Sequence, residues 1–247
     1  MKGPLKAKKR GGASPPGLII IVDRTMDPHL VVYHDPKSLL AEQYRSFRTN
    51  LMALNRAGSP RSILFTSTVK GEGKSVTAAN IGICVAELPS AKAVIIDADF
   101  RAPVQDQLFG LEKGPGLADL ILDGLPLDRI LLPTKVRNLY VIRSGRQPRN
   151  PSELLGSERM LSVIHALKAE FNFVLFDSPP VNPFTDAATL AALTDGVVFV
   201  VRMERTHRTD IERAIGSISD AGGRVIGTFL TALEPREREY YEYAGYE

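Results

Sequence analysis

The stretch from Ser62 to Thr77, SILFTSTVKGEGKSVT, decides the fold of this chain. It begins with an apolar run, passes through Gly71 and Gly73, and continues from Lys74 in a helical pattern. Glycines at these places let backbone N–H groups turn toward a phosphate, because no Cβ blocks its approach. The order therefore predicts a strand, a phosphate-binding loop and a helix.

The loop is a variant of the common pattern G-x-x-x-x-G-K-[ST], because Thr68 stands where that pattern begins with glycine. Lys74 adds a positive charge, and Ser75 places a hydroxyl where Mg²⁺ sits, at the start of the following helix. We expect the nucleotide to contact nine consecutive residues: Thr68, Val69, Lys70, Gly71, Glu72, Gly73, Lys74, Ser75 and Val76.

Strand and helix patterns alternate along the rest of the chain. Apolar runs predict strands at residues 93–96, 138–142, 173–176, 197–201 and 225–230. Helices are expected at residues 75–88, 116–122, 151–168, 187–193 and 209–219, with Asn150 capping the third and Thr185 or Asp186 the fourth. This alternation predicts a doubly wound α/β domain with a mainly parallel sheet flanked by helices.

An amphipathic helix is predicted at residues 38–55, before the loop. Five apolar residues recur there at alternating spacings of four and three: Leu40, Tyr44, Phe47, Leu51 and Leu54. We expect this face to pack on the domain. Glu42, Arg45 and Arg48 lie three apart on the remaining surface, where such residues usually form exposed ion pairs.

Acidic residues follow two of the predicted strands. Asp97 and Asp99 come after the run at 93–96, and Asp177 follows the run at 173–176. The carboxyl ends of parallel strands form the rim at which α/β proteins bind ligands. Carboxylates gathered there repel one another and need a cation, and Mg²⁺ takes carboxylates together with phosphate oxygens and water. Together with Ser75, the three aspartates supply such a shell.

Composition sets further bounds. The 247 residues are 44% hydrophobic and 24% charged, which fits one large domain with tails. The longest apolar runs, at residues 18–22 and 197–201, are too short to cross a bilayer, so we expect a cytoplasmic protein. Cys84, the single cysteine, lies in an apolar pattern and is expected to fill the core.

The net charge of +3 comes from the N-terminal residues. Five cationic residues precede the first acidic residue, Asp23: Lys2, Lys6, Lys8, Lys9 and Arg10. Without them the remainder carries about −2, which argues against a nucleic-acid-binding surface. Residues 1–16 have little to bury, so we expect a disordered basic tail, of which residues 2–10 can touch anionic lipid.

Four segments resemble motifs of the bacterial tyrosine kinases of capsule and exopolysaccharide synthesis, which are variant-P-loop ATPases. VIIDADFR, ending in Arg101, is similar to the second nucleotide motif of that family, and FVLFDSPP is similar to the third. The family's E-x-x-R-x-x-R helix is matched by Glu42, Arg45 and Arg48. Its C-terminal tyrosine cluster is matched by Tyr240, Tyr241, Tyr243 and Tyr246. The resemblance covers roughly residues 27–247.

The resemblance implies the P-loop NTPase fold, a Walker A loop, and ATP and Mg²⁺ as cofactors. Lys74 would neutralise phosphate charge, and Ser75, Asp99 and Asp177 would serve the metal. Asp97 would orient or deprotonate the attacking tyrosine hydroxyl. Arg101 would belong to the nucleotide-binding set. The ATP-binding kinase domain would span residues 17–233, followed by a flexible tyrosine-rich tail at 234–247.

The same resemblance implies an ATP-dependent protein-tyrosine autokinase that regulates exopolysaccharide or capsule polymerisation and export. A ring of identical subunits would phosphorylate tail tyrosines in trans, with the helix at 38–55 forming the subunit contact. Because the chain shows no transmembrane segment, a membrane polysaccharide co-polymerase on a separate polypeptide is expected as activator. It would recruit the protein to the inner face of the cell membrane.

Two other functions stay open. A partition or positioning ATPase would carry a signature lysine five residues before Lys74, where Val69 stands here, so Lys70 is one place off. A nucleotide-gated scaffold of the export machinery would use ATP to assemble the ring, with little catalysis. The tyrosine kinases also commonly have Pro where Lys70 stands, and Asn near the base where Thr231 stands.

Overall fold

The computed structural model describes residues 23–53 and 61–232. The strands are β1 (Arg61–Ser67), β2 (Ala93–Asp97), β3 (Leu131–Pro133), β4 (Leu139–Ile142), β5 (Phe173–Asp177), β6 (Gly196–Arg202) and β7 (Val225–Thr231). The helices are α1 (Val31–His34), α2 (Leu39–Ala53), α3 (Lys74–Ala86), α4 (Gln105–Leu108), α5 (Leu117–Asp123), the 3₁₀ helix η1 (Leu127–Arg129), α6 (Pro151–Leu155), α7 (Glu158–Glu170), α8 (Asp186–Ala191) and α9 (Arg208–Asp220). No helix in these two ranges is long and apolar enough to cross a membrane.

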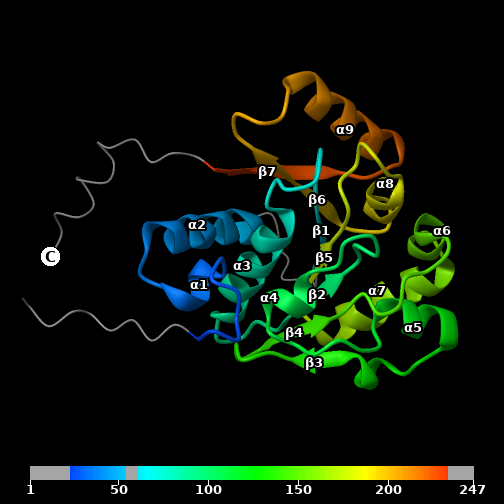
Figure 1. Cartoon of the computed structure of the whole chain (residues 1–247), viewed down its shortest axis with the longest axis horizontal. Helices are drawn as coiled ribbons and strands as arrows, with labels where there is room; N and C mark the ends of the chain where they lie inside the picture. Colours follow the sequence, from blue (N-terminus) through cyan, green and yellow to red (C-terminus); the bar gives the residue numbers. More distant parts are fainter. Residues whose placement is uncertain (1–22, 54–60, 233–247) are drawn as a thin grey trace, which may run out of the picture.

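The seven strands form one sheet in the order β3-β4-β2-β5-β1-β6-β7 (Figure 1). Every neighbouring pair is parallel except β3 and β4, which are antiparallel. The predicted doubly wound, mainly parallel α/β fold is confirmed. The edge strand β3 was not predicted, because its three residues, which end in Pro133, form no apolar run long enough to mark a strand.

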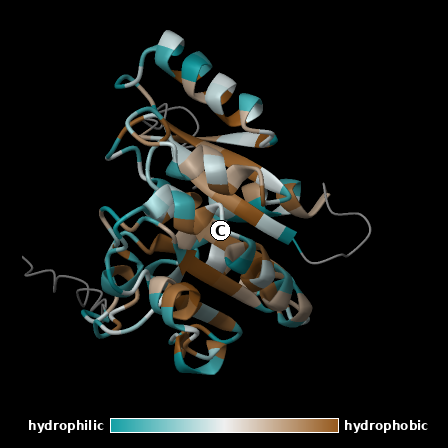
Figure 2. Cartoon of the chain, turned by 90° about the vertical axis from the view of Figure 1, so that its right-hand side faces the viewer, coloured by the Kyte–Doolittle hydropathy of each residue, from teal (hydrophilic) through white to brown (hydrophobic). Residues whose placement is uncertain are grey.

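The core lies on both faces of the sheet. In β1, Leu64 faces the cluster beneath α5, α7, α8 and α9, whereas Ile63 and Phe65 face the cluster beneath α1, α2 and α3. Figure 2 shows the strands as the hydrophobic middle layer, with hydrophilic residues on the outer sides of the helices. Residues buried on both faces explain why the strands appear in the sequence as uninterrupted apolar runs. Cys84 is fully buried in α3, as its apolar surroundings predicted.

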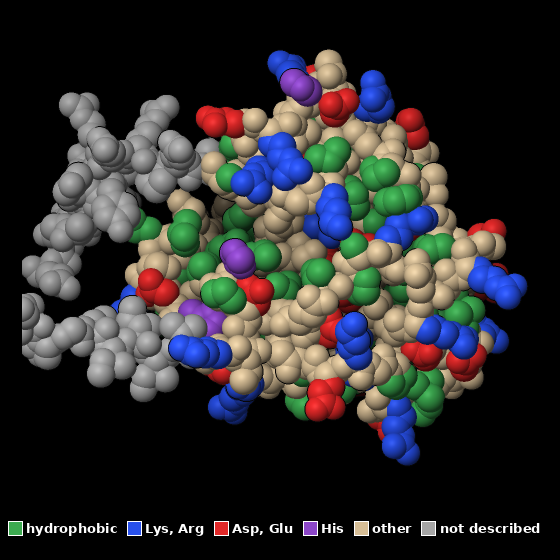
Figure 3. Space-filling view, in the orientation of Figure 1, with side chains coloured by type: hydrophobic (Ala, Val, Ile, Leu, Met, Phe, Trp, Pro, Cys, Tyr) green, Lys and Arg blue, Asp and Glu red, His purple; other side chains and the backbone are tan. Residues whose placement is uncertain are grey.

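Charges of both signs are interspersed over the face seen in Figure 3, with basic and acidic side chains next to one another. This distribution agrees with the nearly balanced charge that the sequence predicts for the chain beyond its basic N-terminus. The basic residues 2–10 lie outside the described residues.

The predicted inner face of α2 is partly wrong. Three of the five predicted residues do pack inward: Tyr44, Phe47 and Leu51. Leu40 is 53% exposed, and Leu54 lies outside the described residues. The packed stripe instead passes through Ala41, which is fully buried, and the ring of Tyr44 stacks on Phe229 of β7 at a centroid distance of 5.1 Å. The stripe is therefore rotated by about one residue, or about 100°, at the start of the helix.

The single helix predicted at 151–168 is two helices, α6 and α7. They are separated at Gly156 and Ser157, and the Ser157 hydroxyl accepts a hydrogen bond from the N–H of Met160, 3.2 Å away. Ser157 thus caps a new helix, which its place before Glu158 and an apolar pattern could have indicated. Asn150 stands at the N-cap of α6 and Pro151 in its first turn, as predicted, but the Asn150 side chain donates to Glu153 and makes no cap bond with the described residues.

Candidate active site

The phosphate loop connects β1 to α3 at the middle of the sheet, as predicted. Gly71 and Gly73 have φ values of +86° and +91°, which favour glycine. Within the described ranges, the backbone N–H groups of residues 70–75 donate to no acceptor. A row of free N–H groups at a helix N-terminus is what an anionic phosphate requires, so the loop fits the predicted ligand.

The structure shows why the loop does not need a glycine at its first position, Thr68. Its φ is not positive, so the backbone there is open to any residue, and its side chain is fully buried. Its hydroxyl oxygen is buried without a hydrogen-bond partner among the described residues. The expected site residues Val69 and Lys70 are exposed at the outer side of the loop.

The three predicted aspartates meet Lys74 at the carboxyl ends of β2 and β5. Asp97 and Asp177 are neighbours across the two parallel strands. The Lys74 ammonium nitrogen lies 3.1 Å from Asp99 Oδ2 and 3.5 Å from Asp177 Oδ1, and it donates to the Ser75 hydroxyl at 3.1 Å. The structure therefore brings together the five residues that the sequence assigned to phosphate and metal chemistry.

Burial dominates the electrostatics of this cluster. Desolvation, followed by the charge of Asp177, raises the pKa of Asp97 to about 8. Desolvation likewise raises the pKa of Asp177, although the charge of Lys74 opposes it. Burial disfavours the charge of Lys74, yet Asp177 and Asp99 outweigh this and raise its pKa. Lys74 is thus held charged between carboxylates of which one or more favour the protonated form.

The two oxygens of Asp97 are occupied by the backbone. Oδ1 accepts from the N–H of Asp99 at 3.2 Å, and Oδ2 accepts from those of Val104 and Gln105, each at 2.9 Å. The Asp97 side chain is 1% exposed. Asp97 therefore also fixes the turn that carries Asp99.

Gln105 is a site residue that sequence reasoning missed. Its side-chain amide donates to Asp177 Oδ2 at 2.9 Å and to the carbonyl of Ser75 at 3.1 Å. It is fully buried and links the acidic strand ends to the first turn of α3. A lone glutamine eight residues after Asp97 gives no pattern that would have marked it.

The acidic cluster can hold Mg²⁺ only together with further ligands, namely water and phosphate oxygens. Within residues 23–53 and 61–232, no group of three or more His, Cys, Asp or Glu side chains is arranged to hold a metal ion. Asp177 Oδ1 is nevertheless buried and accepts no hydrogen bond in that part of the chain, and Ser75 is beside it. Because Mg²⁺ usually takes one or two carboxylates and completes its shell with water and phosphate oxygens, this donor set fits the ion.

Arg101 is bound to the start of α8. Its guanidinium binds Asp186 at the start of α8, with Nε 2.7 Å from Oδ2, and lies 3.7 Å from the centroid of the Phe184 ring. The structure thus pairs it with a buried acid. Thr185, the other expected cap of α8, makes no side-chain cap bond.

Glu42, Arg45 and Arg48 are joined by a partner that the sequence analysis did not identify, Glu87 after α3. Arg45 lies 2.6 Å from Glu42 and 2.7 Å from Glu87, and Arg48 lies 3.4 Å from Glu87. Arg48 also donates to the carbonyl of Cys84 at 2.9 Å. The Glu87 hydrogen bond is the main cause that raises the pKa of Arg45. Both arginines therefore fasten α2 to α3 within one subunit.

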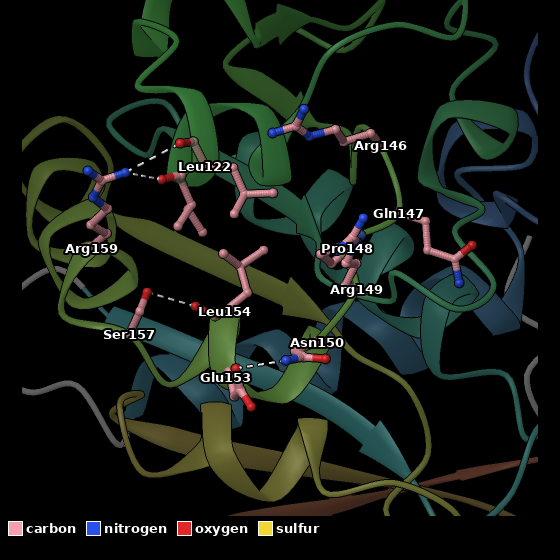
Figure 4. A pocket seen from close by; sticks show the side chains of 11 residues that line it. Leu122, Arg146, Gln147, Pro148, Arg149, Asn150, Glu153, Leu154, Ser157 and Arg159 are labelled. Atoms are coloured by element: carbon pink, nitrogen blue, oxygen red, sulfur yellow. Dashed lines mark hydrogen bonds between the residues drawn. The ribbon is translucent and has the colours of Figure 1, made fainter.

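A separate hollow of about 640 Å³ lies beside α5, α6 and the start of α7, and none of its lining residues belongs to the phosphate loop. Figure 4 shows Arg159 reaching toward the last turn of α5, with Arg146 and Arg149 on the opposite side. Arg159 donates to the carbonyl of Ile121 at 2.7 Å, and Arg146 lies 2.7 Å from Asp123. These contacts stabilise the end of α5 and add nothing to the predicted site.

The predicted phosphoacceptors Tyr240, Tyr241, Tyr243 and Tyr246 lie outside the described residues. The described chain ends just after β7, beside the phosphate loop, where the Thr231 hydroxyl donates to the carbonyl of Glu72 at 2.8 Å. The last described residues therefore lie close to the loop.

The chain is similar to known proteins over most of its length, although no protein-family model matches it. It is 34% identical to the putative tyrosine-protein kinase CapB of Staphylococcus aureus over 222 residues, which are 90% of this chain and 96% of that protein. The crystal structure of the chimerical protein CapA2B2 matches with a TM-score of 0.77 and 34% identity, over 82% of this chain and 88% of the other. The cell division ATPase MinD of Pyrococcus furiosus, with 22% identity, a TM-score of 0.61, and 72% of this chain and 74% of the other covered, shares the fold. The chain belongs to the family of bacterial capsule tyrosine-protein kinases.

Proposed function

We propose that this protein transfers the γ-phosphoryl group of ATP to tyrosine hydroxyls in its own C-terminal tail. The observation that carries the proposal is the cluster of Lys74, Asp97, Asp99 and Asp177 at a loop whose N–H groups at residues 70–75 bind no acceptor in the described part of the chain. Phosphoryl transfer needs mainly positioning and charge neutralisation, which such a cluster provides.

Each residue of the cluster has a place in that reaction. Loop N–H groups and Lys74 bind the phosphates, while Ser75, Asp99 and Asp177 would hold Mg²⁺. When bound, this ion supplies charge neutralisation at the phosphate oxygens. Gln105 holds Asp177 in place through its amide.

Asp97 is the proposed acceptor of the tyrosine proton. Its pKa of about 8 is close to the working pH, where a general base is most effective. Positive charge brought close to it, from Lys74 and a bound cation, lowers that pKa and favours the carboxylate. The backbone bonds of Asp97 keep it at the strand end while its protonation changes.

The assembly in which the reaction occurs also belongs to the proposal. Residues 17–233 form the kinase domain, and four of the chain's seven tyrosines fall in its last eight residues. Subunits in a ring phosphorylate one another's tails, with the α2 helix at the contact. A membrane polysaccharide co-polymerase on another polypeptide activates the kinase and brings it to the membrane, so that phosphorylation regulates polymer export.

The first test compares the wild type with Lys74→Met in the presence of ATP and Mg²⁺, with phosphate mapped by mass spectrometry. We expect tail tyrosine phosphate in the wild type and a decrease of more than about 100-fold in the variant, because loss of the lysine removes phosphate neutralisation. Circular dichroism checks that the variant folds. Absence of tyrosine phosphate in the wild type, even with the cytoplasmic segment of the membrane partner added, would contradict the proposal.

A mixing experiment tests transfer in trans and separates the alternatives. A chain ending at residue 233 should phosphorylate the intact tail of Lys74→Met, because it supplies a site without an acceptor. Release of inorganic phosphate by dimers without tyrosine phosphate would instead indicate a positioning ATPase. ATP-driven assembly with neither product would indicate a scaffold.

A further inference from the structure

Glu72 of the phosphate loop is a buried carboxylate to which the proposed reaction gives no role. Its side chain is 1% exposed, and no Lys, Arg or His of the described ranges forms an ion pair with it. A buried charge is costly unless hydrogen bonds replace its hydration. The hydrogen-bond partners of the Glu72 carboxylate therefore indicate its role.

The carboxylate joins the beginning of the loop to the end of β6. Oε2 accepts from the N–H of Val69 at 2.8 Å, within the loop. Oε1 accepts from the N–H of Arg202 at 3.2 Å and from the hydroxyl of Thr206 at 2.5 Å. The corner at residues 202–206, between β6 and α9, thus holds the loop from outside.

The same corner also holds one carbonyl group of the loop, and β7 holds the next one. The guanidinium groups of Arg202 and Arg205 each donate to the carbonyl of Gly71 at 3.3 Å. The carbonyl of Glu72 accepts from the Thr231 hydroxyl at the end of β7. A Cβ on Gly71 would come within 2.9 Å of Arg205 Nη1, so the end of the Arg205 side chain would have to shift.

Because of peptide geometry, these carbonyl hydrogen bonds also determine where the N–H groups of the loop point. In a trans peptide, the carbonyl of one residue and the N–H of the next point in opposite directions. Fixing the carbonyls of Gly71 and Glu72 toward β6 and β7 therefore directs the N–H groups of Glu72 and Gly73 the other way. Those N–H groups have no acceptor in the described part of the chain and remain free for an anion.

We infer that Glu72 is a positioning residue: its carboxylate clasps the phosphate loop to the β6–α9 corner and so keeps the loop where the carbonyl contacts to that corner and to β7 set the direction of its phosphate-binding N–H groups. The inference rests on the proposed nucleotide-binding role of the loop. A loop held in its binding geometry before the ligand arrives loses less conformational entropy on binding. The clasp thus contributes to affinity for the nucleotide rather than to the transfer step.

The test removes the outer end of the clasp with Thr206→Val and restores its hydroxyl with Thr206→Ser. Thr209→Val, on an exposed residue nearby, is the matched control. Affinity for a non-hydrolysable ATP analogue with Mg²⁺ is measured by calorimetry, and KM for ATP and kcat by phosphate incorporation. We expect the valine variant to bind about 5- to 10-fold more weakly and to raise KM, with kcat changed less than about twofold. The serine and control variants should match the wild type within about twofold.

Glu72→Gln tests the inner end. Its amide oxygen can still accept from Arg202 and Thr206, but its NH₂ group then faces the N–H of Val69, so one loop contact becomes repulsive. We expect a loss of affinity at least as large as that of Thr206→Val. If this variant does not fold, the affinities of Thr206→Val and Thr206→Ser decide on the inference alone.

Unchanged affinity in Thr206→Val, or a fall in kcat without a rise in KM, would overturn the inference. A wild type that binds the analogue but phosphorylates no tyrosine would overturn the proposed kinase function instead, and the affinities would still decide on the clasp.

Discussion

Thr68 lies where the common loop pattern has glycine, and its backbone shows no need for one. Its φ is not positive and its side chain is buried. We expect Thr68→Gly to lower the free energy of unfolding by about 1 kcal/mol, because glycine gains more freedom in the unfolded chain. Nucleotide affinity should not improve. Urea unfolding and calorimetric titration measure the two quantities.

Thr68→Ala is the matched control for that change, since alanine keeps the Cβ but loses the hydroxyl, which has no partner among the described residues. It should cost less than glycine, because an unsatisfied buried hydroxyl contributes little to stability. A glycine variant that is as stable as the wild type and binds nucleotide more tightly would show that the loop is strained at this residue.

Asp97 makes stability depend on pH in the nucleotide-free protein. Its pKa is about 8 in the folded chain and near 3.8 in the unfolded chain, so between these values the folded state binds more protons. The free energy of unfolding should therefore fall as the pH rises from 5 to 8, by at most about 1.4 kcal/mol per pH unit from this group. Asp97→Asn removes the titration and should give a flatter slope in denaturant unfolding. Parallel slopes for the two proteins would contradict this assignment.

The residues of the site differ in how well they can be predicted from the sequence. Asp97 and Asp177 end apolar strand runs and Lys74 follows the glycines of the loop, so each is marked by a pattern, and the structure brings them together as predicted. Gln105 and Glu87 act through contacts set by the fold, 72 and 42 residues from the chain positions they bind. Such partners have no local pattern, so sequence reasoning from periodicity and motifs does not find them.

Among the elements, α2 depends on Glu87 for its attachment to α3. Glu87 bridges Arg45 and Arg48, and its side chain is 31% exposed. We expect Glu87→Gln to lower the free energy of unfolding by about 1 kcal/mol, near the upper end for partly exposed pairs. Glu42→Gln, at a side chain that is 63% exposed, should change it by less than about 0.3 kcal/mol.

Urea unfolding at low and high salt measures the difference in the free energy of unfolding between these two variants. The loss in Glu87→Gln should shrink at high salt, because screening weakens partly exposed ion pairs. Equal small effects of both substitutions would mean that apolar packing of Tyr44 and Leu51 alone holds the helix.

Element types could be predicted well from the sequence, whereas several boundaries could not. The strand runs of β1, β2, β5 and β6 are apolar because helices cover both faces, and this signal is strong. The division of 151–168 into α6 and α7 depends on the competition between helix continuation and the cap of Ser157. Periodicity alone does not reveal the break, because apolar residues of both helices contribute to the same core cluster.

At the scale of the whole molecule, the site ties together segments that are far apart in the chain. Lys74 follows β1, Asp99 follows β2 and Asp177 ends β5, and these three strands form the centre of the sheet in the order β2-β5-β1. A ligand that binds all three therefore stabilises the sheet as one unit. We expect ATP with Mg²⁺ at 100 times its Kd to add about 2.7 kcal/mol to the free energy of unfolding.

Chelation of Mg²⁺ by EDTA should remove most of this gain, because ATP alone brings negative charge next to Asp97, Asp99 and Asp177, where like charges repel. Thermal unfolding with ATP and Mg²⁺, with ATP and EDTA, and with Mg²⁺ alone separates the contributions of the nucleotide and of the metal ion to stability. Lys74→Met should show little rise in Tm under any of these conditions. An equal rise in Tm with and without EDTA would show that the carboxylates contribute no metal site to nucleotide binding, and the roles proposed for Ser75 and Asp177 would then be wrong.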